Sequence, residues 1–273
     1  MTDAISGPAD LEAALPSVSV NTVAGLRDLH TLLVATAATV ADPPSAALKR
    51  VALLLATDGS APVSQTPPRE RVALVLLAAG SSDAAWQLLR DTAALGTKRP
   101  AIATVVEPPR VFADLPGFRD PRADGSEDCY DVSDAVTLAV TVDEVWRDGD
   151  VVRLGGSAVH SLLATEANDR VCVVLTAPGG GRQSVVGQRH RRPDLVKGTG
   201  SALTRRAWGG WSASVPLDDR GHGNGPQVLS LEVEHRGIVR SAGIGRNASV
   251  AATAVAAGCL DVSTTPWRLP ARF

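Results

Sequence analysis

Two aspartates on either side of one glycine, Asp148-Gly149-Asp150, are the first residues of this sequence whose types and spacing could do chemistry. An Asp-x-Asp pair is the form in which many glycosyltransferases hold a metal and a nucleotide-sugar. Asp-Gly is also the strongest short signal for a β-hairpin turn. A metal-binding pair would end a strand of an α/β nucleotide-binding domain, and no alternation of helices and parallel strands precedes this one. The context therefore favours a turn between expected strands at 136–146 and 151–159.

A metal-dependent alternative remains open around the same aspartates. His222 lies in the stretch DDRGHGNG together with Asp218, and histidine with carboxylates can form a metal site or an acid–base pair. In this alternative Asp148, Asp150, Asp218 and His222 would serve a self-sufficient metal-dependent transferase or hydrolase whose site lies in the sandwich loops. A polar loop tip is the simpler interpretation of His222. We therefore expect no metal, no cofactor and no catalytic residue.

A basic stretch rich in arginine and tryptophan, GRQSVVGQRHRRPDLVKGTGSALTRRAWGGW, begins at residue 181. Arginine presents planar donors that match phosphate or carboxylate, and tryptophan can stack on the face of a sugar. No recognition helix or RNP-type signature accompanies the stretch, so we expect no nucleic-acid partner. A solvated loop with its tryptophans in the core is the alternative. The candidate binding residues are Arg189, Arg191, Arg192, Arg205, Arg206 and Trp208.

A second motif, GIGRNA at 243–248, matches the dinucleotide-binding fingerprint with alanine at its end. Asp261 follows at about the distance at which an acidic residue contacts a ribose in that fold. The fingerprint requires a strand, a turn and a helix within a doubly wound sheet. The stretch SVAATAVAAG that follows has side chains too small to cover a sheet. We therefore expect the end of a strand followed by a loop.

The elements that must position these residues fall into two parts. Residues 21–42 place leucine and valine at helical spacing, with Asn21 as the expected N-cap. A second helix is expected from Ser45, and the stretch LLAAGSSDAAWQLL indicates a helical hairpin in which Gly80 ends the first helix. We therefore predict an α-helical linker domain over residues 1–97.

The residue pattern changes after residue 97, where the helical periodicity ends. Residues 98–134 hold five prolines and no helical period, which predicts an ordered connector. Residues 135–250 alternate as short strands separated by glycine- or aspartate-rich turns, which is typical of an antiparallel sandwich or barrel. Residues 251–273 are expected to form a C-terminal extension. The predicted class is α+β and multidomain, with an N-terminal helical bundle followed by an antiparallel β-sandwich.

Charge and cysteine content indicate the domain organisation and the cellular compartment of the protein. The formal net charge is −2, but 11 basic and 17 acidic side chains lie in 1–134, and 16 basic and 12 acidic side chains lie in 135–273. This asymmetry also suggests two domains. The three cysteines lie far apart without a CxxC motif, which favours a reducing compartment. The sequence shows no signal peptide, and its apolar runs at 51–56 and 73–79 are too short for a membrane span. We expect a soluble, cytoplasmic protein.

Residues 100–246 resemble the accessory region that follows the catalytic domain in actinobacterial family-2 glycosyltransferases, which are akin to teichoic-acid, poly(ribitol phosphate) glycosyltransferases. The β-sandwich of that region opens with a tryptophan, an acidic turn and an L-x-G-x-A strand, and it closes with a W-x-x-x-V strand and an arginine-bearing strand. The resemblance implies that a helical linker leads into an immunoglobulin-like sandwich. The matching residues are Trp146, Asp148, Leu154, Gly156, Ala158, Trp211, Val215 and the strand GIVRSAGIG.

The resemblance also implies a role. The catalytic domain of the family would lie before residue 1, so none of its catalytic residues is carried over. What remains is a non-catalytic accessory function that serves cell-wall glycosylation: binding of an anionic acceptor glycopolymer, or homo-oligomerisation, in partnership with a glycosyltransferase catalytic domain. Such a partner would hold the chain at the inner face of the membrane. A further alternative is a protein–protein adaptor in which residues 1–97 dock a partner.

Overall fold

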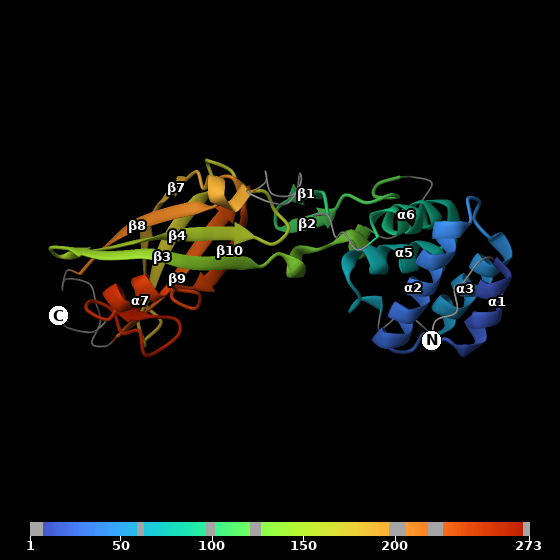
Figure 1. The fold of residues 1–273 in the computed structure, drawn as a ribbon, viewed down its shortest axis with the longest axis horizontal. Coiled ribbons are helices and arrows are strands. Elements are labelled where there is room, and N and C mark those ends of the chain that lie inside the picture. Colours follow the sequence, from blue (N-terminus) through green and yellow to red (C-terminus); the bar gives the residue numbers. More distant parts are fainter. Residues whose placement is uncertain are drawn as a thin grey trace. The chain divides into compact units, whose positions relative to one another are not determined.

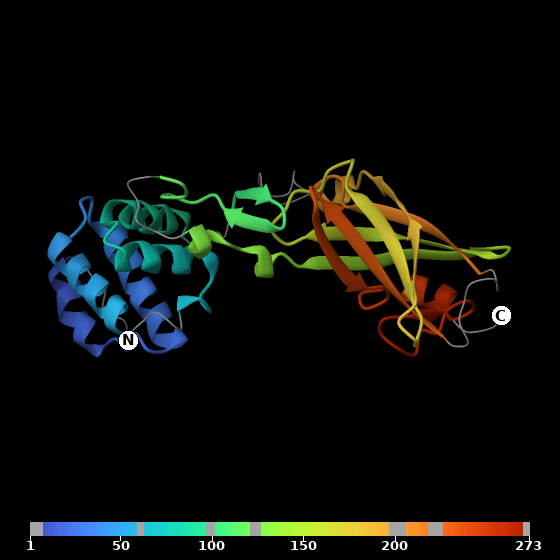
Figure 2. The same cartoon turned by 180° about the vertical axis from the view of Figure 1, so that it is seen from behind.

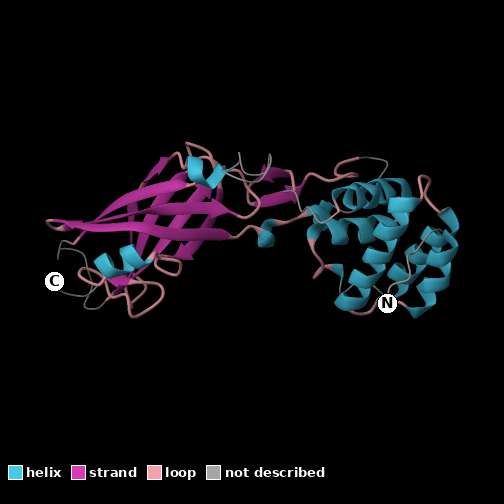
Figure 3. Ribbon diagram, in the orientation of Figure 1, coloured by secondary structure: helices cyan, strands magenta, loops and turns pink. Residues whose placement is uncertain are grey.

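The protein divides into two compact units. The computed structural model describes residues 8–58, 63–96, 102–120, 127–196, 206–217 and 226–269. One unit comprises residues 1–105 and 111–132, and the other comprises 106–110 and 133–273. We call them the helical unit and the sheet unit. Figure 3 shows helices in the first and strands in the second, so the predicted α+β class with its N-terminal helices is confirmed.

Buried leucines hold the helices of the helical unit together. Figure 1 shows the arrangement of these helices. They are α1 (Pro8–Ala14), α2 (Val23–Thr39), α3 (Ser45–Asp58), α5 (Pro68–Ala78) and α6 (Ser82–Leu95). Helix α2 packs against α6, and α5 packs against both α3 and α6. The N-cap of α2 is Thr22, whose hydroxyl accepts a hydrogen bond from the amide of Gly25 at 3.1 Å, so the prediction of Asn21 was wrong by one residue.

The predicted helical hairpin is confirmed as α5 and α6. Gly80 lies between them with a φ of +80°, a conformation that glycine adopts without steric cost. Trp86, Leu88 and Leu89 are buried on the inner face of α6. The indole nitrogen of Trp86 donates to the carbonyl of Ala41, which joins α6 to the segment between α2 and α3.

An aromatic cluster orders the proline-rich region that follows the helices. The short strands β1 (Thr104–Glu107) and β2 (Arg110–Ala113) pair with each other. The rings of Phe112 and Phe118 stack with centroids 5.4 Å apart, and Tyr130 lies 5.3 Å from Phe118. The guanidinium of Arg71 in α5 donates to the carbonyl of Cys129, so these turns are tied to the helices.

The sheet unit consists of two antiparallel sheets (Figures 1 and 2). One has the order β3-β4-β8-β7, and the other has the order β10-β9-β5-β6 with β11 paired to β9. The strands are β3 (Leu138–Asp148), β4 (Val151–His160), β5 (Arg170–Thr176), β6 (Arg182–Val186), β7 (Gln188–His190), β8 (Gly210–Pro216), β9 (Gln227–His235), β10 (Ile238–Gly243) and β11 (Arg268–Leu269).

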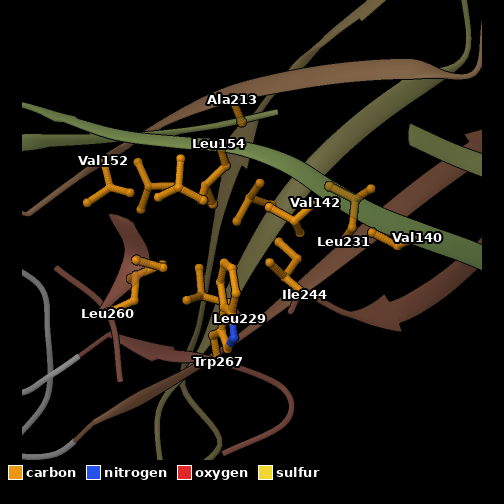
Figure 4. Close-up of a cluster of buried hydrophobic side chains, with 14 of the residues drawn as sticks. Val140, Val142, Val152, Leu154, Ala213, Leu229, Leu231, Ile244, Leu260 and Trp267 are labelled. Atoms are coloured by element: carbon orange, nitrogen blue, oxygen red, sulfur yellow. The ribbon is translucent and has the colours of Figure 1, made fainter. Parts of the chain in front are cut away.

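Alternating apolar side chains from both sheets form one core (Figure 4). Val142 and Leu154 come from one sheet, and Leu229 and Leu231 come from the other. The alternation in β3 shifts at a bulge between Val142 and Glu144, after which Val145 is the next buried residue. A strict period of two could not place this shift. Trp211 is fully buried among these residues.

The residues after 250 complete the same core. The short helix α7 (Val250–Ala256) begins at Ser249, whose hydroxyl accepts from the amide of Ala252. Leu260 and Trp267 belong to the core cluster. Gly245 lies directly under the Trp267 ring, and a Cβ at that position would come within 2.5 Å of the ring.

The strand order shows which structure the GIGRNA motif at 243–248 adopts. A helix does follow β10, where a loop was expected, but β10 runs antiparallel to β9 and belongs to no doubly wound sheet. Asp261 accepts hydrogen bonds from Ser263 and exchanges backbone hydrogen bonds with Arg268. The motif therefore lies at the end of an antiparallel strand and lacks the parallel strand, turn and helix that the dinucleotide fingerprint requires.

Two further features concern the length of the helices and the state of the cysteines. Among the described residues, no helix combines the length and the apolar character that crossing a membrane requires. Cys129, Cys172 and Cys259 carry free thiols, and all three are buried.

Candidate anion-binding surface

The structure confirms the hairpin at Asp148-Gly149-Asp150. Asp148 pairs with Val151, so Gly149 and Asp150 form a two-residue turn, and Gly149 has a φ of +58°. The carboxylate of Asp148 accepts from Arg153 at 2.7 Å. The other residues of the metal-dependent alternative, Asp218 and His222, lie outside the described residues. Within the described ranges, nothing adds a third metal ligand to this turn.

Arg189, the first of the predicted binding arginines, lies inside the sheet unit. Its side chain is 2% exposed. It donates to the carbonyl of Ala158 at 2.8 Å, and its guanidinium lies 3.8 Å from the carboxylate of Asp169. Burial lowers the pKa of Arg189, while the charge of Asp169 opposes that shift. Arg189 therefore anchors β7 internally and presents no donor to a ligand at the surface.

Arg192 is neutralised by two carboxylates. Its guanidinium donates to Asp194 through two nitrogens and to Asp143 of β3, with distances of 2.7 and 2.8 Å. The hydrogen bonds to Asp194 are the largest reason that the pKa of Arg192 lies above its usual value. Two carboxylates around one cation leave no net positive charge there, so Arg192 holds the segment after β7 against β3.

Arg191 and Trp208 form the part of the basic stretch that remains available to a ligand. The Arg191 guanidinium carbon lies 5.6 Å from the centroid of the Trp208 ring, which is a cation–π contact. Arg191 is exposed and Trp208 is partly buried. Among the described residues Arg191 has no ion pair with a carboxylate. Arg206 is also exposed, and Arg205 lies outside the described residues. We call Arg191, Arg206 and Trp208 the Arg191–Trp208 surface.

Four titratable side chains that are distant in sequence meet inside the sheet unit. They are His160, Asp169, Arg189 and His235, and we call them the His160–His235 cluster. The Nδ1 of His235 lies 2.8 Å from one carboxylate oxygen of Asp169, and the other oxygen accepts from the amide of Glu166 at 2.9 Å. The two imidazole rings are 6.2 Å apart. No motif spacing connects the members of this cluster, so the sequence alone does not predict it.

Burial and neighbouring charges keep His160 of this cluster neutral at physiological pH. Burial first, and then the neighbouring His235, Arg189 and Arg240, lower the pKa of His160 to about 4, while Asp169 opposes this shift. Among the residues that the structure describes, neither ring nitrogen of His160 has a hydrogen-bond partner.

One subset of these residues has the donor types of a metal site. Donor atoms of Glu166, Asp169 and His235 lie within 4.8 Å of one another. The guanidiniums of Arg236 and Arg189 already lie against Glu166 and Asp169, respectively. A divalent cation would have to compete with two guanidiniums for these carboxylates, so the arrangement fits an internal ionic anchor better than a metal centre.

No family model and no curated protein matches the chain. Among solved structures, a crystal structure of S. aureus TarS 217–571 is similar with a TM-score of 0.41 and 8% identity over 88% of this chain. A crystal structure of S. aureus TarS has a TM-score of 0.35 and 8% identity over 84% of this chain. The chain spans 64% of the first and 41% of the second. A TM-score below 0.5 does not establish a common fold, and neither structure says what this chain does.

Proposed function

We propose that this chain is a non-catalytic accessory module that binds an anionic, phosphate-bearing glycopolymer through the Arg191–Trp208 surface. The observation that carries this proposal is an exposed guanidinium, stacked over an indole ring, without a carboxylate partner among the described residues. The guanidinium offers N–H donors to a phosphate, and the indole offers an apolar face to a sugar or polyol. Neighbouring Arg206 adds a second exposed cation.

The proposed context is cell-wall glycosylation, with a glycosyltransferase catalytic domain as partner. The resemblance of residues 100–246 to the accessory region of actinobacterial glycosyltransferases is the reason for this choice. A module of this kind would hold the acceptor polymer near a catalytic centre on another domain or chain. The burial of the His160–His235 cluster supports a non-catalytic role, because the side chains of His235 and Asp169 are only 3% and 2% exposed and no substrate can reach them.

We further propose that the sheet unit is an immunoglobulin-like sandwich. In that fold the strands A, B, E and D form one sheet, and G, F and C form the other, with an added C′ in some members. If β3 is strand A, the chain order gives A-B-E-D for one sheet and G-F-C-C′ for the other. This agreement in strand order supports the proposal.

Calorimetric titration of the full chain with a phosphodiester-linked polyol polymer tests the binding function. We expect Arg191→Gln to weaken binding about tenfold, because a hydrogen bond to a charged group contributes about 1.5 kcal/mol or more. Trp208→Leu should weaken binding too. The matched control is Arg170→Gln, which removes one exposed positive charge from β5. Binding should also weaken with added salt.

Two results would contradict the proposal. One is equal loss of binding in Arg191→Gln and Arg170→Gln, which would indicate attraction by overall charge. The other is equal affinity for an uncharged polysaccharide of similar length, which would remove the role of the phosphate. Thermal melting of each variant checks that the sheet unit stays folded, because Trp208 is partly buried.

A further inference from the structure

A groove lies between the outer strands of the two sheets, away from the residues of the Arg191–Trp208 surface. Strand β3 is the outer strand of its sheet, β10 is the outer strand of the other, and the two lie side by side (Figure 1). The groove has a volume of about 490 Å³. Its lining consists of residues 136–140, 240–243, Arg246 and Asn247.

The lining of this groove is cationic. It contains Arg240 and Arg246 and no acidic residue. Arg240 donates to the carbonyls of Val136, Ser133 and Val239, at 2.8, 2.6 and 2.9 Å. These acceptors are neutral, so the charge of Arg240 is not cancelled by them. Neither guanidinium has an ion pair with a carboxylate among the described residues.

Arg240 is also held in place. Its three hydrogen bonds to carbonyls use three of the five N–H groups of a guanidinium, and two remain for another acceptor. Arg246 is exposed at the same groove. One guanidinium held by hydrogen bonds and one exposed guanidinium along a single groove suit an oxyanion, since arginine matches phosphate and carboxylate geometry.

The free strand edges at the groove are too short to accept an added peptide strand. The carbonyl of Val140 accepts from the Asn247 side chain, and the carbonyl of Val142 accepts from the amide of Ser249. Outward-pointing backbone groups recur at every second residue, so β3 offers the amide and carbonyl of Leu138 and the amide of Val140. By the same alternation from the turn at 236–237, Ser241 of β10 points its backbone outward.

We propose that the groove binds a small hydroxyl-bearing oxyanion, such as a sugar or polyol that carries one phosphate or carboxylate. Arg240 and Arg246 hold the oxyanion. The outward amide and carbonyl groups of Leu138 and Ser241 are hydrogen-bond partners for hydroxyls. This site shares no residue with the Arg191–Trp208 surface. The two proposals can therefore be tested independently.

NMR titration of the full chain tests the groove, with the backbone amides of Leu138 and Ser241 as reporters. Glycerol phosphate and glucuronate are the probes, because they distinguish a phosphate ligand from a carboxylate ligand, and glycerol is the neutral control. We expect saturable shifts at both amides with at least one of the two anions and none with glycerol. In Arg246→Gln the affinity should fall about tenfold.

Variants separate this site from the proposed function. Arg170→Gln and Arg191→Gln should leave the shifts at Leu138 and Ser241 unchanged, because neither residue lines the groove. Arg240→Lys keeps a charge but loses the forked hydrogen bonds, and it should weaken binding even where the chain remains folded. The groove proposal is overturned if no saturable shift occurs, if Arg246→Gln binds as the native chain does, or if an acidic peptide binds there in place of both probes.

Discussion

At the scale of single residues, two buried histidines make the stability of this protein depend on pH. Burial lowers the pKa of His30 to about 4, and His160 has a similarly low pKa of about 4. The usual value is 6.5, so the unfolded chain takes up protons first as the pH falls. The stability from the neutral imidazoles is therefore complete above pH 6.5 and is lost as the pH falls toward 4.

Replacing these histidines with leucine should flatten that dependence. At pH 5 each histidine should cost on the order of 2 kcal/mol relative to pH 7, from about 1.4 kcal/mol per pKa unit. Urea unfolding of His30→Leu and His160→Leu at both pH values measures the difference. We expect a smaller loss of unfolding free energy between pH 7 and pH 5 in each variant. An unchanged loss would show that the imidazoles are already accessible to protons in the folded state.

Arg189 and Asp169 make a second prediction at this scale. Arg189→Met should destabilise the sheet unit by about 3 kcal/mol or more, since it leaves the carboxylate of Asp169 buried without that guanidinium. The double variant with Asp169→Asn should cost less than the sum of the two single variants. A double-mutant cycle by thermal or urea unfolding measures the coupling, and simple additivity would rule out the ionic anchor.

At the scale of elements, the turn that leads into α2 depends on a missing side chain. A Cβ on Gly25 would lie 1.6 Å from the carbonyl oxygen of Ser19, which no side chain tolerates. We expect Gly25→Ala to destabilise the helical unit by about 1–3 kcal/mol, as overpacking does. Urea unfolding of the full chain, followed by the helical circular dichroism signal, measures the change. Gly179→Ala is the control, because a Cβ there meets no atom within 4 Å.

Local patterns predicted elements well where one short stretch decides the outcome. Gly80 and the apolar spacing around it predicted the α5–α6 hairpin, and Asp148-Gly149-Asp150 predicted the β3–β4 turn. The bulge near Asp143 could not be predicted, because it interrupts an alternation that continues on either side of it. The short helix α7 was missed because its alanines cover little area, although Ala252 and Ala256 pack into the core.

The candidate site could be predicted only in part, because contacts between residues far apart in sequence determine which arginines are available to a ligand. The basic stretch places Arg189, Arg191 and Arg192 next to one another, but their environments are set by partners elsewhere in the chain. Asp169 and Asp143 decide that two of these arginines are paired internally. The groove at Arg240 was not foreseen either, because its walls come from strands about a hundred residues apart.

At the scale of the whole molecule, each unit has a buried core of its own. The sheet core includes residues from the C-terminal segment, among them Leu260, Trp267 and Leu269. Removal of residues 250–273 should therefore unfold the sheet unit and leave the helical unit folded. We expect circular dichroism of the truncated chain to keep its helical signal and lose its strand signal. A chain ending at residue 269 is the control, and a folded sheet unit in the longer truncation would contradict this account.

The buried thiols give the two units separate reporters of opening. Cys129 belongs to the helical unit, and burial raises the pKa of its thiol to about 11; the pKa of Cys259 in the sheet unit is raised for the same reason. Thiolates are the reactive form, so a maleimide reagent should modify these side chains only when the surrounding structure opens. Mass-resolved alkylation over time would then give an opening rate for each unit in one unlabelled, unmutated sample.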